Sequence, residues 1–148
     1  MNYENWITRS KEEDEALTHQ SGVNYTSIFE KYLDIYKDKK TNFLQIGTRG
    51  GHTIAGLYYY FKKMNLNSIS FKDRNKFIYF SKRIFFKTVD VRDPKQVSKF
   101  LSSNNLFDII FDDEFHYQDG LVLNFKNFIN YCKDVYIIKG FTTDDREL

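Results

Sequence analysis

The chain has 148 residues, of which 22 are basic and 20 acidic, so its formal net charge is only +2. This length fits one domain with a substantial hydrophobic core. The near balance of charge excludes a global field that would draw the protein to nucleic acid or to a membrane. The single cysteine, Cys132, excludes an internal disulfide, and we see neither a signal peptide nor an apolar stretch near the roughly 20 residues of a membrane span. We therefore expect a cytoplasmic protein with no membrane partner.

Helix-like and strand-like segments alternate along most of the chain. Helical periodicity predicts helices over 28–35, 54–63, 75–82, 94–101 and 121–133, the last with Leu121, Phe125, Phe128, Ile129 and Cys132 on one face. Short apolar runs predict strands over 43–46, 68–71, 84–89, 107–111 and 135–138. Strands and helices that alternate at this spacing predict an α/β protein, with a parallel sheet covered by helices on both faces.

A glycine cluster lies directly between the first strand and its helix. Gly47, Gly50 and Gly51 follow the apolar run and precede the helical stretch. In an open parallel sheet, such a turn places backbone N–H groups and a helix N-terminus beside a nucleotide-type ligand. The alternative is a plain turn. The spacing Gly-x-x-Gly-Gly differs from the dinucleotide fingerprint Gly-x-Gly-x-x-Gly, which disfavours a redox cofactor.

Carboxylates follow the second and third strands. Asp73 could accept both hydroxyls of a ribose, although a solvated surface charge explains it equally well. Asp90 could approach an adenine amino group. Asp93 is as well placed to cap the helix that begins at Pro94.

The densest chemical cluster follows the fourth strand, over residues 111–117 (FDDEFHY). Asp113 and His116 are three positions apart, so the carboxylate could hold a divalent cation and the imidazole could act as a general base. The alternative is a polar loop that caps the next helix. Of the other histidines, we expect His52 to begin the helix after the glycine cluster and His19 to be solvated.

Taken together, the glycine cluster, the carboxylates after the strands and the acidic cluster resemble the sequence pattern of class I S-adenosylmethionine-dependent methyltransferases. They are most similar to the small-molecule and sugar O-methyltransferase branch. The resemblance covers about residues 24–140 and depends on four strings: 24–32 (NYTSIFEKY), 43–53 (FLQIGTRGGHT), 107–116 (FDIIFDDEFH) and 135–138 (VYII), with Asp73 and Asp90 between them. The glycine string and the 107–116 string are specific only in combination.

The resemblance implies a fold, a cofactor and site residues. The fold would be a Rossmann-like three-layer sandwich whose mostly parallel five-stranded sheet has the order 3-2-1-4-5. S-adenosylmethionine would be the cofactor, and its contacts would come from Gln45, Gly47, Gly50, Gly51, Asp73, Asp90 and Asp112. Among these, the glycine turn would run beside the methionine part of the cofactor. Asp73 would bind its ribose, and Asp90 would lie near its adenine. Asp113 would be a ligand of a divalent cation such as Mg²⁺, and His116 the base that activates a sugar hydroxyl or another small polar acceptor.

Three departures from the family pattern leave a second interpretation open. Gln45 replaces the acidic residue that precedes the glycine turn, and Lys139-Gly140 replaces the Glu-Asp pair that completes the metal site. Lys139 disfavours the metal because it brings a positive charge to that place, although Asp144 and Asp145 could substitute for the missing acids. The usual sixth and seventh strands are also lacking, so the fifth strand would be an exposed edge that favours a homo-oligomer. The alternative to an O-methyltransferase is therefore a catalytically degenerate module with a binding or scaffolding role.

We expect a single methyltransferase-like domain over 1–148. It comprises an N-terminal helical segment over 1–40, a Rossmann-like core over 41–140 and a tail over 141–148. A nucleotide-sugar or dinucleotide binder of the same architecture is a third interpretation. Basic residues gather around the second and third strands: Lys62, Lys63, Lys72, Arg74, Lys76, Lys82, Arg83 and Lys87. Because solvated helix faces carry the same residues, a nucleic-acid partner is disfavoured.

Overall fold

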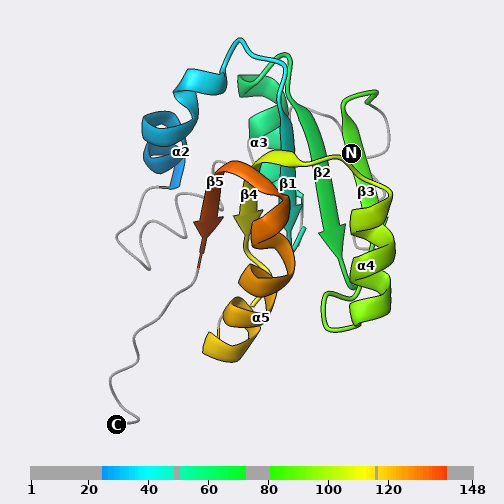
Figure 1. Cartoon of the computed structure of the whole chain (residues 1–148). Helices are drawn as coiled ribbons and strands as arrows, with labels where there is room; N and C mark the ends of the chain where they lie inside the picture. The colour runs from blue at the N-terminus through cyan, green and yellow to red at the C-terminus, as the bar shows by residue number, and fades with distance from the viewer. Residues whose placement is uncertain (1–24, 49–50, 73–80, 116, 140–148) are drawn as a thin grey trace, which may run out of the picture.

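Five parallel strands form one sheet in the computed structural model, which describes residues 25–48, 51–72, 81–115 and 117–139. The strands are β1 (Asn42–Ile46), β2 (Asn65–Ser70), β3 (Ile84–Thr88), β4 (Phe107–Asp112) and β5 (Cys132–Ile138). Their order is β3-β2-β1-β4-β5 and every neighbouring pair is parallel, so β3 and β5 lie at the two edges (Figure 1). The predicted strand order and direction are confirmed.

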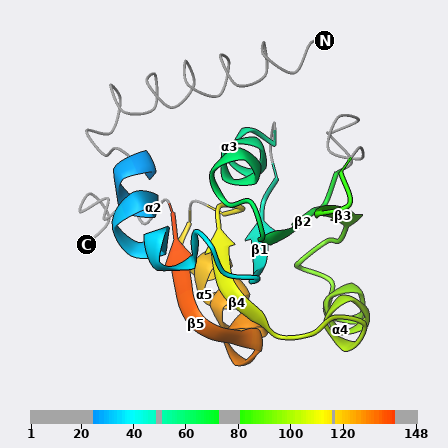
Figure 2. The same cartoon turned by 90° about the horizontal axis from the view of Figure 1, so that it is seen from above.

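Helices cover both faces of this sheet. They are α2 (Tyr25–Leu33), α3 (His52–Tyr60), α4 (Pro94–Ser102) and α5 (Gln118–Phe128), with short 3₁₀ turns at Asp34–Tyr36 and Ile129–Tyr131. Seen from above, α2 and α3 lie on one side of the sheet and α4 and α5 on the other (Figure 2). The predicted three-layer α/β sandwich is confirmed. None of the helices in the described part of the chain has the length and apolar character that crossing a bilayer requires.

Strand residues alternate between two apolar cores. Phe43, Ile109 and Phe111 pack on the side of α2 and α3, whereas Leu44 and Ile110 pack on the side of α4 and α5. Successive side chains of a strand point to opposite faces, and here both faces are covered. This is why the central strands are nearly continuous apolar runs.

Several predicted boundaries are wrong by three residues or more, among them the end of the helix predicted over 54–63, which ends at Tyr60. β2 begins at Asn65, three residues before the predicted start. Its asparagines are poor strand formers, but Asn65 Nδ2 donates to Asn42 Oδ1 (3.1 Å) and Asn67 Nδ2 donates to the carbonyl oxygen of Phe43 (3.1 Å), so the neighbouring strand stabilises them. The predicted helix over 121–133 ends at Phe128.

Cys132 is therefore the first residue of β5 rather than part of a helix face. Phe125, expected on that face, is 40% exposed. The buried stripe of α5 consists of Gly120, Leu121, Asn124 and Phe128. Most of the predicted helix over 75–82 lies outside the described residues.

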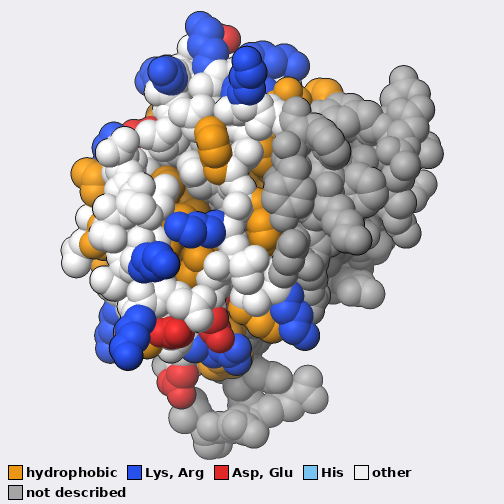
Figure 3. Space-filling view, turned by 90° about the vertical axis from the view of Figure 1, so that its right-hand side faces the viewer, with side chains coloured by type: hydrophobic (Ala, Val, Ile, Leu, Met, Phe, Trp, Pro, Cys, Tyr) orange, Lys and Arg blue, Asp and Glu red, His pale blue; other side chains and the backbone are white. Residues whose placement is uncertain are grey.

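Arg83, one of the basic residues around the second and third strands, has a structural role. Its guanidinium donates to the carbonyl oxygens of Phe61 (2.6 Å), Met64 (3.0 Å) and Tyr58 (2.9 Å), so it satisfies acceptors at the end of α3. On the side where β3 and α4 lie in Figure 1, Lys and Arg side chains are spread among hydrophobic and neutral ones (Figure 3). For the described residues of this face, the arrangement is in keeping with solvated basic side chains; Arg74 and Lys76 lie outside the described residues.

Candidate functional site

The carboxyl ends of β1, β4 and β5 meet at one edge of the sheet. The N–H of Asp113 donates to the carbonyl oxygen of Ile46 (2.8 Å). The N–H of Lys139 donates to the carbonyl oxygen of Asp112 (2.9 Å). These bonds continue the sheet ladder into the loops, so the residues that follow the three strands are held side by side. The sheet thus brings together the glycine turn, the predicted acidic cluster and Lys139.

Gly47 is required by its backbone conformation and by its neighbours. Its φ is +88°, in the left-handed region that favours glycine. A Cβ at this position would lie 2.6 Å from the carbonyl oxygen of Asp113 and 2.6 Å from the nitrogen of Glu114. The β1–α3 turn therefore packs directly against the backbone of the β4–α5 loop. This close contact accounts for Gly47 without a ligand, so a role in ligand approach remains a prediction.

The rest of the turn is anchored to β2 and to α3. Thr48 Oγ1 shares a hydrogen bond of 2.6 Å with Ser68 Oγ, and both side chains are buried. Gly51, with φ of +76°, is the N-cap of α3, and its N–H donates to the carbonyl oxygen of Thr48 (2.8 Å). His52 begins α3, as predicted. Gly50 lies outside the described residues.

Gln45 is buried beside the glycine turn. It is 1% exposed, and its Nε2 donates to the carbonyl oxygen of Gly47 (2.9 Å). A carboxylate could not make this bond, so the amide is matched to its surroundings. The Oε1 atom is buried and has no hydrogen-bond partner in the described part of the chain. A buried acceptor of this kind could receive a donor from a ligand.

Asp112 is fully buried under α5. Its Oδ1 accepts hydrogen bonds from Asn124 Nδ2 (3.0 Å) and from the N–H of Glu114 (3.3 Å). Burial raises the pKa of Asp112 to about 6, while the Asn124 amide and the Glu114 N–H lower it and the charge of Asp113 raises it further. The pKa of Tyr136 is also raised, by burial and by the nearby Asp112. A role for Asp112 in cofactor binding remains a prediction, and its contacts give it a structural role.

Asp113 forms an ion pair with Lys139. Lys139 Nζ lies 3.4 Å from Asp113 Oδ2, and the two side chains are only 12% and 4% exposed. The residues present do not fit a divalent cation, because an ammonium already lies against the carboxylate that would bind it. Within the described residues, no group of three or more His, Cys, Asp or Glu side chains is arranged to hold a metal. His116, the predicted base, and Asp73, the predicted ribose ligand, fall outside those residues.

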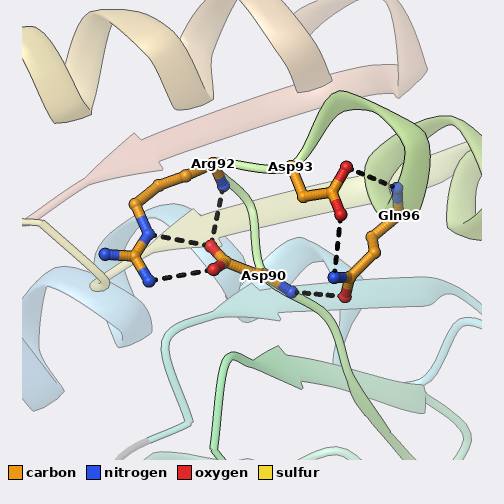
Figure 4. A network of polar contacts seen from close by, with 4 residues as sticks. All are labelled: Asp90, Arg92, Asp93 and Gln96. Atoms are coloured by element: carbon orange, nitrogen blue, oxygen red, sulfur yellow. Dashed lines mark hydrogen bonds and ion pairs between the residues drawn. The ribbon is translucent and has the colours of Figure 1, made fainter.

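Asp90 belongs to a surface network formed by the β3–α4 turn and the first turn of α4 (Figure 4). Both of its carboxylate oxygens accept from the guanidinium of Arg92 (2.9 Å each). The side-chain bonds from Arg92 lower the pKa of Asp90, against the opposing effect of burial. Asp93 is the N-cap of α4, since its carboxylate accepts from the N–H of Lys95 and of Gln96, so the capping interpretation is confirmed. Gln96 links the two acids by accepting from the Asp90 N–H and donating to Asp93 Oδ2.

No protein-family model matches this sequence, and no curated protein matches it. Several solved structures match the fold. The MycE methyltransferase from the mycinamycin biosynthetic pathway, in complex with Mg and SAH, has a TM-score of 0.70 at 18% identity over 77% of this chain and 31% of its own. The fibrillarin/Nop5p complex has a TM-score of 0.56 at 14% identity, over 72% and 53% of the two chains. A short chain dehydrogenase family protein from Francisella tularensis subsp. tularensis SCHU S4 has a TM-score of 0.50 at 14% identity, over 66% and 50%.

The chain has the class I methyltransferase fold. The match to MycE decides this, because its TM-score of 0.70 exceeds the 0.50 of the dehydrogenase. The strand order β3-β2-β1-β4-β5 is common to both folds and does not separate them. The present chain spans about a third of the length of MycE. Identities this low establish the methyltransferase fold and not a shared activity.

Sequence reasoning missed several buried polar residues of this methyltransferase fold. Asn124 lies among the buried residues of α5 and is 0% exposed. The available signal was its position, three residues after Leu121 and four before Phe128, where an apolar side chain is expected. The Thr48–Ser68 hydrogen bond has no comparable signal, because it joins the turn after β1 to β2 across 20 positions of sequence.

Proposed function

We propose that this chain binds S-adenosylmethionine at the carboxyl edge of its sheet and is a methyltransferase domain for a small polar acceptor. The fold is the support for the cofactor class, and the structures of MycE that match it contain SAH and, in one, mycinamycin VI. A sugar hydroxyl, expected from the sequence resemblance, is one acceptor of this class.

The single observation that carries the proposal is the unsatisfied acceptor beside the glycine turn. Gln45 Oε1 is buried next to Gly47, in a fold whose glycine turn lies at the ligand edge. The cofactor's methionine part carries an ammonium group that could donate to it. In the proposed arrangement, the glycine turn (Gly47, Gly50 and Gly51) lies beside the methionine part of the cofactor. Asp73 accepts hydrogen bonds from the ribose hydroxyls, and Asp90 lies near the adenine.

The proposed reaction is a direct displacement. S-adenosylmethionine would supply the methyl group: the acceptor oxygen would bond to the methyl carbon as the carbon–sulfur bond breaks, which would leave S-adenosylhomocysteine as the neutral thioether. The acceptor's proton goes to a base, for which the sequence offers His116. Asp113 and Lys139 would lie beside this base and contribute charge rather than a covalent step.

Calorimetry with S-adenosylmethionine and with S-adenosylhomocysteine tests cofactor binding. We expect saturable binding of both ligands by the full chain, weakened several-fold by Asp90→Ala. Asp134→Ala is the matched control, because it removes an exposed carboxylate from β5 outside the candidate site. No heat at millimolar ligand would remove the proposal. A thermal-shift comparison with NADP distinguishes it from a dinucleotide binder, since only the bound ligand raises the melting temperature.

A second variant tests transfer separately from binding. We expect His116→Ala to abolish methyl transfer while leaving the affinity for S-adenosylmethionine unchanged. Equal transfer by the variant would refute the role of His116.

The alternative is a module that binds without turnover. The ion pair of Asp113 with Lys139 favours it, and so does the position of β5, which pairs only with β4 in the described sheet. An edge strand of this kind favours self-association. Sedimentation at high protein concentration tests this alternative, and a strictly monomeric species would argue against it.

A further inference from the structure

The ion pair between Asp113 and Lys139 is built into the sheet. The backbone of each residue continues a strand ladder: the N–H of Asp113 donates to Ile46 (2.8 Å) and that of Lys139 to Asp112 (2.9 Å). The ammonium and the carboxylate lie 3.4 Å apart. Because both backbones are fixed by neighbouring strands, the lysine faces the aspartate as a consequence of the fold.

A second Lys–Asp pair lies at the other end of β4 and β5 and serves as an internal reference. Lys133 Nζ lies 3.2 Å from Asp108 Oδ1, and these side chains are 45% and 17% exposed. The corresponding values for Lys139 and Asp113 are 12% and 4%. Water screens the first pair and is largely excluded from the second, so the charge of Lys139 acts on Asp113 much more strongly.

We propose that Lys139 is a built-in cation that takes the place of a divalent metal at this edge, so that the site works without a metal. A divalent ion coordinated by Asp113 would approach the ammonium of Lys139 to within a few ångströms, in surroundings that screen the repulsion poorly. The carboxylate already has the positive partner that burial demands. That this site transfers methyl groups rests on the proposed function. That Lys139 occupies the place of a metal does not depend on it.

The lysine and the metal are therefore expected to exclude each other, and this can be measured on the whole chain. Mn²⁺ serves as the probe, followed by electron paramagnetic resonance and by its effect on the melting temperature. We expect no Mn²⁺ binding by the wild-type chain that depends on Asp113. We expect Lys139→Met, which keeps the apolar stem and removes the charge, to gain one Mn²⁺ site and a rise of several degrees in melting temperature on adding Mn²⁺.

Three control variants complete the experiment. Lys139→Arg keeps the charge and should behave as the wild type does. Lys133→Met removes the equivalent charge at the exposed pair and should gain no Mn²⁺ response. Asp113→Asn combined with Lys139→Met should lose the gained site. Should Lys139→Met not fold, Lys139→Glu should fold only when Mn²⁺ is present, because it adds a second carboxylate ligand.

Either of two results would overturn the inference. One is Mn²⁺ binding by the wild-type chain that Asp113→Asn abolishes. The other is no Mn²⁺ response when Lys139 is replaced, whether by Met or, if that variant does not fold, by Glu. Calorimetry with S-adenosylhomocysteine reports on the proposed function independently, so a failure of one conclusion is distinguishable from a failure of the other.

Discussion

Two sites at the carboxyl end of the sheet each pair an aspartate with a basic side chain, one at the surface and the other buried. The β3–α4 turn joins Asp90, Arg92 and Gln96 within six positions of sequence, at the surface. The β4–β5 edge joins Asp113 to Lys139 across 26 positions, out of water. The first network satisfies its own charges locally and is screened by solvent. In the second, each charge depends on its partner because water cannot replace it.

Removing the lysine from the buried pair is the strongest way to test this contrast. Lys139→Met leaves the Asp113 carboxylate buried without this partner, so we expect the free energy of unfolding to fall by about 3–5 kcal/mol. Arg92→Met breaks the exposed pair, whose side chains are 57% and 31% exposed, and should cost less than about 1 kcal/mol. Urea unfolding in metal-free buffer measures both values. Equal losses of unfolding free energy in the two variants would show that burial does not make the Asp113–Lys139 pair more important for stability than the Asp90–Arg92 pair.

Asp112 gives the buried edge a pH dependence of opposite sign to that of an ordinary acid. Its pKa is 3.8 in the unfolded chain and about 6 in the fold, mainly because of burial. Between these values the folded chain holds the extra proton, so stability falls as the pH rises through this window, by about 3 kcal/mol in total. The pKa of the exposed Asp90 is lowered instead, so its contribution is lost as the pH falls.

Asp112→Asn should remove this pH dependence. The introduced amide keeps an acceptor for Asn124 Nδ2 and offers a donor to Asn124 Oδ1, which is buried without a partner in the described part of the chain. We expect the variant to be more stable than the wild type by up to about 3 kcal/mol at pH 7 and equal to it near pH 4. Urea midpoints at the two pH values provide the measurement. A variant that loses stability at both would mean that Asp112 is needed as a charge.

Glycine substitutions extend the comparison from side chains to the backbone. Gly47→Ala places a Cβ 2.6 Å from two backbone atoms of the β4–α5 loop at a φ of +88°, so we expect a loss of about 1–3 kcal/mol. Gly56→Ala is the matched control, because a Cβ there meets no atom within 4 Å and Gly56 lies inside α3. This control should gain about 0.5–1 kcal/mol. Thermal melts of both variants give the signs, and a neutral Gly47→Ala would refute the packing argument.

The sheet could be predicted from the sequence because its signals are local and redundant. Apolar runs with helices between them predict parallel strands, and the order follows from the resemblance. The boundary at Cys132 could not be predicted in this way. The helical pattern continues past Phe128, and pairing of Cys132 with Phe107 on β4 overrides it. Asn65 likewise joins β2 because its amide has a partner on β1.

The same distinction holds for the candidate site. The residue types at the ends of β4 and β5 are visible in the sequence, and the positive charge of Lys139 already indicates that a metal is disfavoured there. Lys139 and Asp113 are 26 positions apart in the chain, and the pairing of β4 with β5 brings them into contact. The hydrogen bond from Asn124 to Asp112 is likewise not visible in the sequence, because it depends on how α5 packs on β4. Asp93, in contrast, caps the helix that begins at the next residue, so its role was predictable.

Replacement of this cap tests the exposed turn where its network is best defined. Asp93 accepts from the N–H of Lys95 (2.9 Å) and from the side chain of Gln96 (3.0 Å). Asp93→Ala leaves first-turn N–H groups of α4 to water, so we expect a loss of about 1 kcal/mol, and Asp93→Ser should recover most of it because serine also caps. The loss should be similar at low and high salt, since capping depends on hydrogen bonds more than on net charge. A loss as large as that of Lys139→Met would mean that the exposed turn, too, depends on partners that water cannot replace.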